Sequence, residues 1–599
     1  MLCASTFKGV QEKTIVITQV KSTRQGLASM PSKYNNDRTS PHGSPAPELE
    51  SANASYTCGN SPHTMISMKS PLPPRLDDGA LRPGQALGVF SVQYIGILIQ
   101  YAAVGLLYGT LPQTILPFLT YYLNTEGIVT AAASALLDIP WSFKIFFGML
   151  SDNFPIFGFR RRPYMLLGWS ICASALFIAG TLPMPDPYFP NPEWREIKPE
   201  NYTPEIRSAL NDSARNAGTP YILLMTLASM GFLMADCAAD GTIVEYAQRE
   251  PLAIRGRIQT AVYTVRTIFM ALAQLLLAFG LNSPQYGGHF DFGLSFSAIM
   301  FILASCCVIV IPVTWFFILE EKYTECDFKQ SLRQLWDMIQ NRVYYQLIAY
   351  SFFSGVFSGI GYVAAGPMTS YWIKASSFSV SMAAMVGYAF FALGLFLTGM
   401  FGLNWNWRYM VAGTTISILS LDAISTMLAT FDIVRTPWFW LGTSVVESIP
   451  GGMMFIVQSY VVVELAEDKN EGTLYGILTT SQNVGSPFAT SIEKNINSMF
   501  AVWNEDIMND TPKTRRDVAI TIWISYITTL FALVFLVWLP SQKEETRILK
   551  ATSKKNKWMG MLTISYISFA LLWSILSNIL SIFASTQCLS LTGGCKNGS

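Results

Sequence analysis

The sequence has few charged residues and almost no histidine. Asp, Glu, Lys and Arg make up only 13% of its 599 residues, about half the share of a soluble protein, so an ordinary soluble enzyme is excluded. Forty basic and thirty-nine acidic residues leave a net charge of +1, so nucleic acid is not an expected partner. Two of the three histidines, His42 and His63, lie near the N-terminus. A histidine-based metal centre or catalytic triad therefore cannot be assembled.

Two further signals are missing. The chain has no Gly-x-x-x-x-Gly-Lys phosphate loop, so direct ATP hydrolysis is not expected. Residues 1–82 are rich in Ser, Pro, Asn and Thr and contain no apolar run long enough for a signal peptide or an anchor. We expect this segment to be a disordered cytoplasmic tail. Its Ser-Pro pairs are either phosphorylation sites or part of a plain solvated linker. We expect no enzymatic activity, no cofactor and no metal.

Long apolar runs are abundant instead, because 51% of the residues are hydrophobic. Segments such as 87–110 and 521–540 continue for roughly 20 residues without a charge, the length that crosses ~30 Å of hydrocarbon as a helix. The runs lack the ten-residue alternation of a barrel, and backbone groups in lipid must be satisfied within the segment, so helices are predicted. We predict an all-α membrane protein with thirteen spans, at 88–110, 128–150, 163–183, 220–244, 259–281, 293–319, 345–367, 379–402, 408–430, 438–464, 474–498, 518–539 and 559–584.

Lysine and arginine are concentrated in alternate turns, those that follow the even-numbered spans. Short cytoplasmic loops collect these residues, so we predict a cytoplasmic N-terminus. We expect this multi-pass protein to lie in the plasma membrane. The turn between spans 3 and 4 would then be external, and it carries glycosylation triplets at Asn201 and Asn211. The thirteenth span would leave the C-terminal end outside. There, Cys588 and Cys595 either pair in an oxidising compartment or remain free.

Two short matches indicate an internal repeat. Val244-Glu245-Tyr-Ala at the end of span 4 matches Val463-Glu464-Leu-Ala at the end of span 10, and the turn after span 2 has a weaker counterpart after span 8. Transporters are commonly built from two such helical halves, with the substrate site between them. We predict a major-facilitator-like 6+6 bundle plus one C-terminal helix. The expected parts are the tail 1–82, a first bundle 83–319, a cytoplasmic linker 320–344, a second bundle 345–540, and 541–599 with a basic loop, the thirteenth span and an external tail.

The turn after span 2 carries a recognisable signature. Gly148 to Arg162 resembles the cytoplasmic signature of major facilitator transporters, with Gly158 ahead of three arginines. Its longer form, Ser151-Asp-Asn-Phe-Pro-Ile-Phe-Gly-Phe-Arg-Arg-Arg-Pro-Tyr164, resembles the folate-biopterin transporter family. Further matches are Pro140-Trp141 with Lys144 in span 2, Asp236 and Asp240 with Val244-Glu245 in span 4, and Gln259 with Arg266 in span 5. The thirteenth span resembles the long form of oomycete-type members. The resemblance implies a carrier for folates, pterins or related metabolites.

The candidate site consists of the rare ionisable residues within the predicted spans of the first half. Such residues are costly in a membrane and must face a partner or a wet cavity. The predicted substrate and proton site comprises Asp138, Lys144, Asp236, Asp240 and Arg266. Asp236 and Asp240 lie four residues apart on one helical face, so one of them should bind a proton more tightly unless Lys144 or Arg266 lies between them. The alternative is a purely structural ion network. Asp422 and Glu447 in the second half are ligands or simply satisfied polar contacts.

A second group of residues is predicted to act in gating. Asp152 and the arginine cluster could form an inner charge clasp that holds the outward-facing state, although the arginines also satisfy the inner-positive rule. Glu245 and Glu464 could pair with Arg255, Arg257 or Lys469 in the same clasp. The predicted gating residues are Gly148, Asp152, Gly158, Arg160, Arg161, Arg162, Glu245 and Glu464.

The sequence therefore predicts an alternating-access carrier in the lipid bilayer for a folate- or pterin-like small molecule, with protons as the expected coupling ion. A carboxylate suits the amino group and ring N–H of a pterin, and Arg or Lys suits the anionic tail of a folate. The alternatives are a facilitator for another small metabolite, or a membrane receptor on the same fold that does not transport.

Overall fold

The structure is a computed structural model. It describes residues 84–594, apart from Val89, 252–256, Glu321, 323–327, Leu403 and 466–470. The predicted tail and Cys595 lie outside the described residues. Cys588 is disulfide-bonded. In the part that is described, the regular elements are helices.

Long helices occupy the six positions predicted in the first half. They are α2 (Val92–Thr110) with η1 (Pro112–Thr114) and η2 (Ile115–Tyr122), α3 (Gly127–Asp138) with η3 (Ile139–Phe143) and α4 (Lys144–Asn153), α5 (Arg162–Thr181), α7 (Thr219–Gln248), α8 (Arg257–Gly280) and α9 (Phe296–Phe317). The predicted end of span 1 at residue 110 is wrong, because helical turns continue to Tyr122. Pro112 begins a 3₁₀ turn, where its missing N–H is tolerated, and a π-helical segment follows.

The second half and the C-terminal helix follow the same pattern. They comprise α10 (Phe328–Ile339), α11 (Arg342–Gly359), α12 (Ala365–Pro367), η9 (Met368–Trp372), α13 (Ser377–Leu397), η10 (Thr398–Gly402), α14 (Trp407–Thr430), α15 (Pro437–Leu465), α16 (Glu471–Asn497), α17 (Asn504–Asn509), α18 (Pro512–Ala532), η11 (Leu533–Trp538), α19 (Lys543–Thr552) and α20 (Lys557–Ile582). Ten helices in the described residues are long and apolar enough to cross a membrane. The helices α11, α15 and α16 occupy the other three predicted spans.

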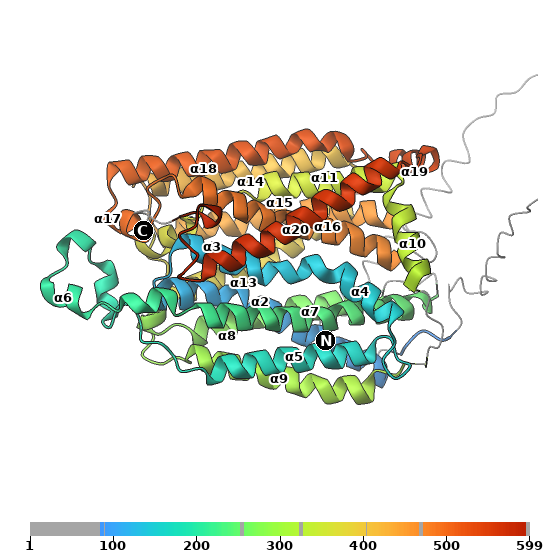
Figure 1. The fold of residues 1–599 in the computed structure, drawn as a ribbon, viewed down its shortest axis with the longest axis horizontal. Coiled ribbons are helices and arrows are strands. Elements are labelled where there is room, and N and C mark those ends of the chain that lie inside the picture. Colours follow the sequence, from blue (N-terminus) through green and yellow to red (C-terminus); the bar gives the residue numbers. More distant parts are fainter. Residues whose placement is uncertain are drawn as a thin grey trace, which may run out of the picture. The chain divides into compact units, whose positions relative to one another are not determined.

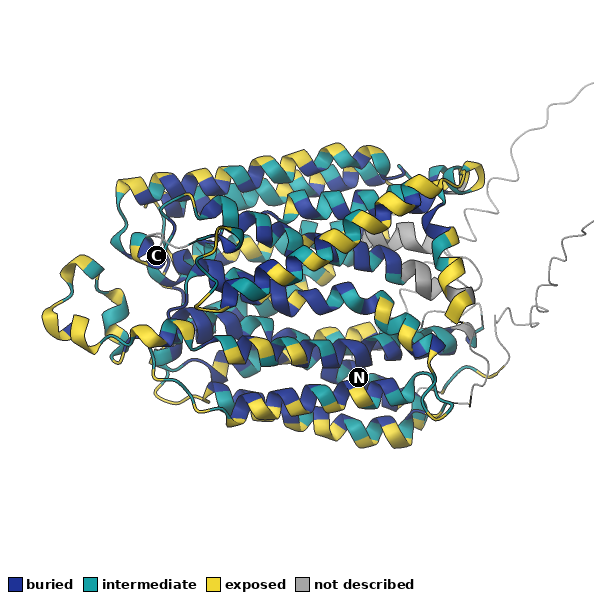
Figure 2. Cartoon of the chain, viewed as in Figure 1, coloured by how far each residue is buried: buried dark blue, intermediate teal, exposed yellow. Residues whose placement is uncertain are grey.

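The helices lie side by side, as Figure 1 shows. Within the first half α5 packs on α7 and α9, and α2 packs on α8; within the second half α13 packs on α15, and α11 on α16. Exposed residues line α9, α18 and α20 in Figure 2, and they include Ile309, Trp523 and Leu572. Large apolar surfaces of this kind are typical of helices that face lipid. The chain is an all-α, multi-pass membrane protein.

Several helix contacts join the first half to the second. Helix α8 packs on α13, and α16 packs on α3, η3 and α4. At this second contact the Asn483 side-chain amide donates to the Trp141 carbonyl at 3.3 Å, and the Ile145 N–H donates to the Thr480 hydroxyl at 3.4 Å. Both contacts are adjacent to the predicted substrate site, because α4 begins at Lys144 and α8 carries Arg266. The bundle boundaries 83–319 and 345–540 remain a prediction.

The helix α20 lies across α16 and α3 (Figure 1). Its attachment point is Lys494 of α16, which is fully buried. The ammonium of Lys494 donates to Asn578 Oδ1 at 2.8 Å and to Ser581 Oγ at 2.6 Å, both on α20. The thirteenth helix is thus attached to the second half by specific hydrogen bonds as well as by apolar packing.

The ends of the two halves that are predicted to lie outside are tied together. Asn124 accepts hydrogen bonds from the Tyr371 hydroxyl and, at 3.1 Å, from the Asn504 amide. The Tyr121 hydroxyl donates to the Ala375 carbonyl at 2.6 Å. These bonds connect residues about 250 to 380 positions apart. A route to this side therefore requires the bonds to break.

A salt-bridge cluster in the same region holds the turn before α18. Arg435 and Arg515 both bind the Asp510 carboxylate, with N–O distances of 2.7 Å to Oδ2. Burial raises the pKa of the Asp510 carboxyl, but the hydrogen bonds from the two arginines outweigh burial and hold the pKa below its usual range. Asp510 therefore stays ionised in this cluster.

Candidate functional site

Lys144 lies between the two aspartates of α7. Pro140 begins the 3₁₀ segment η3, and α4 starts at Lys144, so the lysine projects from a break between two helical segments. Its Nζ is 2.7 Å from Asp236 Oδ2 and 2.9 Å from Asp240 Oδ2. We call these three residues the ion lock. The sequence predicted a proton on one aspartate only if no cation lay between them, and this condition is not met.

The two aspartates differ in exposure. The Asp236 side chain is 1% exposed and the Asp240 side chain is 27% exposed. The buried Tyr101 hydroxyl donates to Asp240 Oδ1, while Lys144 binds the other oxygen. Asp236 thus serves as the buried counter-ion, and Asp240 presents the accessible carboxylate. Sequence reasoning missed Tyr101, since a tyrosine in an apolar helix carries no signal of its own.

Arg266 lies near the lock but is not paired with it. Its guanidinium carbon is 5.8 Å from the centre of the Tyr108 ring and 5.6 Å from that of the Tyr263 ring. Within the described part of the chain Arg266 has neither a hydrogen bond nor an ion pair. Its electrostatic partners include Asp236 and the tyrosines. The structure thus brings Arg266 together with Lys144, Asp236 and Asp240, while its N–H groups remain available.

Asp138 at the end of α3 is the fifth predicted residue. Its side chain is exposed, although it lies within a predicted span. Tyr108 is within electrostatic range of Asp138, Arg266 and Lys144, which places Asp138 beside the same cluster. Among the residues that the structure describes, Asp138 has no hydrogen-bond or ion-pair partner. A carboxylate of this kind at membrane depth requires water, a proton or a ligand.

Aromatic rings complete the cluster. Lys144 Nζ lies 4.9 Å from the centre of the Trp141 ring, and Trp141 meets the Tyr108 ring at 5.1 Å in an edge contact. The Tyr101 and Tyr263 rings also meet edge to face, at 6.2 Å. These rings could not be selected from the sequence, because aromatic residues also fill bundle cores and interfacial belts.

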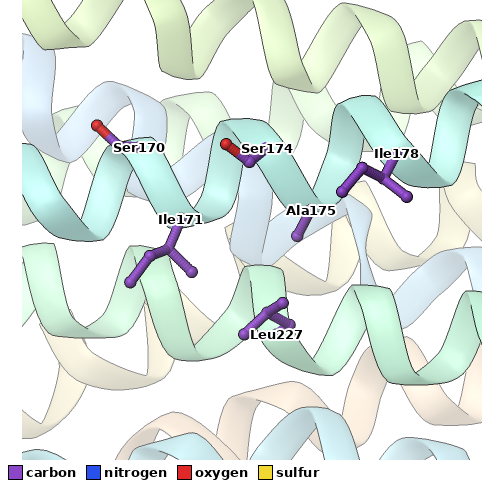
Figure 3. Close-up of a pocket in the computed structure, with 6 residues that line it drawn as sticks. All are labelled: Ser170, Ile171, Ser174, Ala175, Ile178 and Leu227. Carbon is purple, nitrogen blue, oxygen red and sulfur yellow. The ribbon is translucent and has the colours of Figure 1, made fainter.

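One surface pocket lies elsewhere, between α5 and α7 (Figure 3). It is lined by the uncharged residues Ser170, Ile171, Ser174, Ala175, Ile178 and Leu227. None of these belongs to the charged cluster. The pocket offers no charged group to a polar solute, so we do not assign the substrate to it.

The arginines predicted to act in gating form ion pairs, and the pairs that the structure describes connect elements of the first half. Arg161 binds Asp152 at 2.5 Å, and Arg160 binds Glu245 at 3.3 Å. Arg162 instead lies over the rings of Phe159 and Trp315, at 4.5 and 4.7 Å. The turn that carries the arginines depends on Gly158, whose φ is +83°. At Gly148 an added Cβ would meet only the Cys237 sulfur at 3.7 Å, so space does not require glycine there.

Glu320 is a clasp residue that the sequence did not reveal. Its carboxylate accepts the backbone N–H groups of Arg160, Arg161 and Arg162 at 2.7 to 3.1 Å. These groups begin α5, where an anion is favoured by the unpaired N–H groups and the helix dipole. Glu320 could have been identified by its position, since it is an acidic residue at the end of span 6, on the side where arginines are predicted to gather.

The other predicted clasp pairs have a mixed outcome. Arg257 pairs with Glu250 at 3.6 Å, while Glu245 pairs with Arg160 and Arg161. Of the cations that the sequence offered to Glu245 and Glu464, Arg257 thus pairs with Glu250, and the arginine cluster reaches Glu245 from the neighbouring turn. Arg255 and Lys469 lie outside the described residues, and so does the side chain of Glu464.

The acidic residues of the second half lie apart from Lys144 and Arg266. Asp422 accepts hydrogen bonds from the Tyr526 hydroxyl at 2.7 Å and from Thr426 at 3.1 Å. One Glu447 carboxylate oxygen, Oε1, is buried without a hydrogen bond in the described residues. Asp422 is thus a satisfied polar contact, one of the two alternatives that the sequence left open.

A multi-pass helical chain with a charged, aromatic-lined site beside the contact between its halves has the organisation of a membrane transporter for a small molecule. Residues 105–188 match the BT1 family. The chain is 21% identical to folate transporter 1 of Plasmodium falciparum (isolate 3D7), over 75% of this chain and 79% of that protein. It is 22% identical to the folate-biopterin transporter of Synechocystis sp. (strain ATCC 27184 / PCC 6803 / Kazusa), over 70% and 77%. These matches agree with the resemblance to the folate-biopterin transporters that the sequence motifs indicate.

Among solved structures, a D-xylose-proton symporter aligns with a TM-score of 0.49 and 13% identity, over 76% of this chain and 99% of that one. A nucleoside transporter, NupG, aligns with a TM-score of 0.46 and 13% identity, over 74% and 98%.

Proposed function

We propose that this transporter moves a folate- or pterin-like solute across the plasma membrane by alternating access, coupled to protons. The observation that supports the proposal best is the site itself. An accessible carboxylate on Asp240 and a guanidinium on Arg266 that has no ion-pair partner among the described residues lie in one aromatic-lined cluster. A pterin ring offers adjacent N–H donors to a carboxylate, and a folate tail offers carboxylates to a guanidinium. The names of the two curated relatives point to the same solutes.

The proton is assigned to Asp138 in this proposal. Lys144 neutralises much of the charge on Asp236 and Asp240, so repulsion no longer favours protonation of that pair. Asp138 has no cation partner among the described residues and is exposed, so a proton can reach it and would reduce its cost in the membrane. One proton that moves down ~100 mV supplies ~2.3 kcal/mol, enough for roughly fifty-fold accumulation of solute.

The test is uptake of labelled folate and biopterin in cells that lack their own carrier, with and without an inward proton gradient. We expect accumulation that requires the gradient. The Asp138→Asn variant should still equilibrate the solute but should lose accumulation, whereas Asp291→Asn, at an exposed loop position, should behave as the wild type. Absence of uptake of both solutes despite surface expression would refute the transport proposal in favour of a receptor. Full accumulation by Asp138→Asn would show that Asp138 does not carry the coupled proton.

Glycan mapping tests the proposed orientation. Asn201 is exposed in the turn between α5 and α7, whereas Asn211 is half-buried and its amide donates to the Asp186 carbonyl at 3.1 Å. If this turn is external, we expect a glycan on Asn201. A glycosidase-sensitive shift in mass should disappear in Asn201→Gln. The matched variant Asn216→Gln, which is exposed in the same turn but lies outside any Asn-x-Ser/Thr triplet, should leave it unchanged. An accessible but unmodified Asn201 in a glycosylating host would contradict the orientation.

A further inference from the structure

Seven residues of the first half form a closed sequence of contacts around the site, which we call the contact ring. The ammonium of Lys144 contacts the Trp141 ring, which contacts the Tyr108 ring. The guanidinium of Arg266 contacts the rings of both Tyr108 and Tyr263. The Tyr263 ring contacts Tyr101, whose hydroxyl donates to Asp240, and Asp240 pairs with Lys144 to close the ring. The members come from α2, η3, α4, α7 and α8, so the ring joins four of the predicted spans. Charged and aromatic groups share it.

The two sides of the contact ring are not equivalent. On the side of Lys144, every charge is paired, and the Tyr101 side chain is fully buried. On the side of Arg266, the guanidinium lies 5.6 and 5.8 Å from two ring centres, near the ~6 Å limit of a cation–π contact. Tyr263 is 44% exposed. We call this the open side, because it is partly exposed and combines two aromatic rings with N–H donors of Arg266 that have no hydrogen-bond partner among the described residues.

We propose that the open side of the contact ring is the binding slot for a flat aromatic anion, in which Tyr108 and Tyr263 stack on the solute and Arg266 binds its carboxylate. Tyr101 is a positioning residue in this arrangement, because it orients the Asp240 carboxylate through Oδ1. The inference rests on the proposed function and goes beyond it by assigning ring selectivity to the two tyrosines and charge selectivity to Arg266.

The slot also reaches the second half. Tyr388 of α13 is within electrostatic range of Tyr108, and α13 packs on α8, the helix that carries Arg266 and Tyr263. A solute that fills the slot would therefore lie beside the α8–α13 contact. Because this contact must change when the halves rock, occupancy of the slot is coupled to the movement that carries the solute.

The experiment compares KM for labelled folate, which carries carboxylates, with KM for labelled biopterin, which carries none. Replacing Tyr108 by Leu removes a stacking face and should raise both KM values by about tenfold, whereas Tyr108→Phe should change them little. Arg266→Gln should raise KM for folate by about ten- to a hundredfold and leave KM for biopterin nearly unchanged. Surface expression and melting temperature in detergent show that each variant is folded.

Competition against folate uptake by the wild type supplies a measurement that needs no variant. An aromatic carboxylate such as p-aminobenzoylglutamate should inhibit at much lower concentration than glutarate, an aliphatic dicarboxylate. Transport with unchanged KM values in folded Tyr108→Leu and Arg266→Gln, or equal inhibition by the two competitors, would overturn the slot while leaving the proposed function intact. A wild type that moves neither folate nor biopterin would instead refute the proposed function.

Discussion

Replacing Lys144 by methionine is expected to abolish transport and to destabilise the folded protein by about 3–5 kcal/mol, the cost of removing one partner from a buried ion pair. The ammonium is the ion-pair partner within 3 Å of both Asp236 and Asp240. Without it, the Asp236 carboxylate, which is 1% exposed, faces a second carboxylate on the same helix. Total stabilities of 5–15 kcal/mol make this a large loss. The measurements are melting temperature in detergent and solute uptake.

The double variant Lys144→Met/Asp236→Asn separates the two effects. Removing the buried anion together with its cation should restore most of the stability, because neither partner is then left uncompensated. It should not restore uptake, since Asp240 has lost the lysine that holds its second oxygen. Lys513→Met, at an exposed position, is the control for removing a positive charge. A Lys144→Met protein with wild-type melting temperature and uptake would show that the ion lock is dispensable.

The charged part of the site could be predicted because charge is rare in this sequence. Only a few ionisable residues fall within the spans of the first half, so membrane energetics selected Lys144, Asp236, Asp240 and Arg266 without any knowledge of the fold. The spacing of the two aspartates also predicted their common face. What the spacing could not give was the position of Lys144, which depends on the 3₁₀ break at Pro140 and on the packing of α4 against α7.

The uncharged part of the site could not be predicted, for the same physical reason. Tyr101, Tyr108 and Tyr263 resemble the many other aromatic residues of a membrane bundle, and only their contacts distinguish them. Glu320 was missed because its partners are backbone N–H groups, which every residue has. Its role follows from the place where α5 begins relative to the end of α9, and local sequence does not specify this relation.

The fold was easier to predict from the sequence than the site. Apolar length alone located helices at the thirteen predicted positions, because lipid permits few alternatives to a helix. The largest error was at the end of span 1, which was placed at residue 110, whereas a 3₁₀ turn that begins at Pro112 and a π-helical segment continue to Tyr122. A proline removes one donor but does not prevent the chain from continuing in a tighter or wider helical form.

The second large effect is expected at Gly105, where α2 touches the backbone of α8. A Cβ added there would lie 2.3 Å from the Arg266 carbonyl oxygen and about 3 Å from the Arg266 Cα. Backbone atoms cannot rotate away as a side chain can, so Gly105→Ala must move the two helices apart. Overpacking of this kind costs about 1–3 kcal/mol. The same movement separates Tyr108 on α2 from Arg266 on α8, so we expect a lower melting temperature and a loss of uptake.

The matched control is Gly413→Ala in α14, where an added Cβ meets nothing within 4 Å. Alanine favours a helix over glycine by about 1 kcal/mol, so this variant should be as stable as the wild type or slightly more stable, and it should transport normally. The opposite signs of the two glycine-to-alanine changes exclude a general effect of the substitution. If Gly105→Ala melts and transports as the wild type does, the close approach of α2 and α8 does not set the geometry of the contact ring. Transport would then continue with Arg266 displaced, which contradicts its proposed role in binding the carboxylate of the solute.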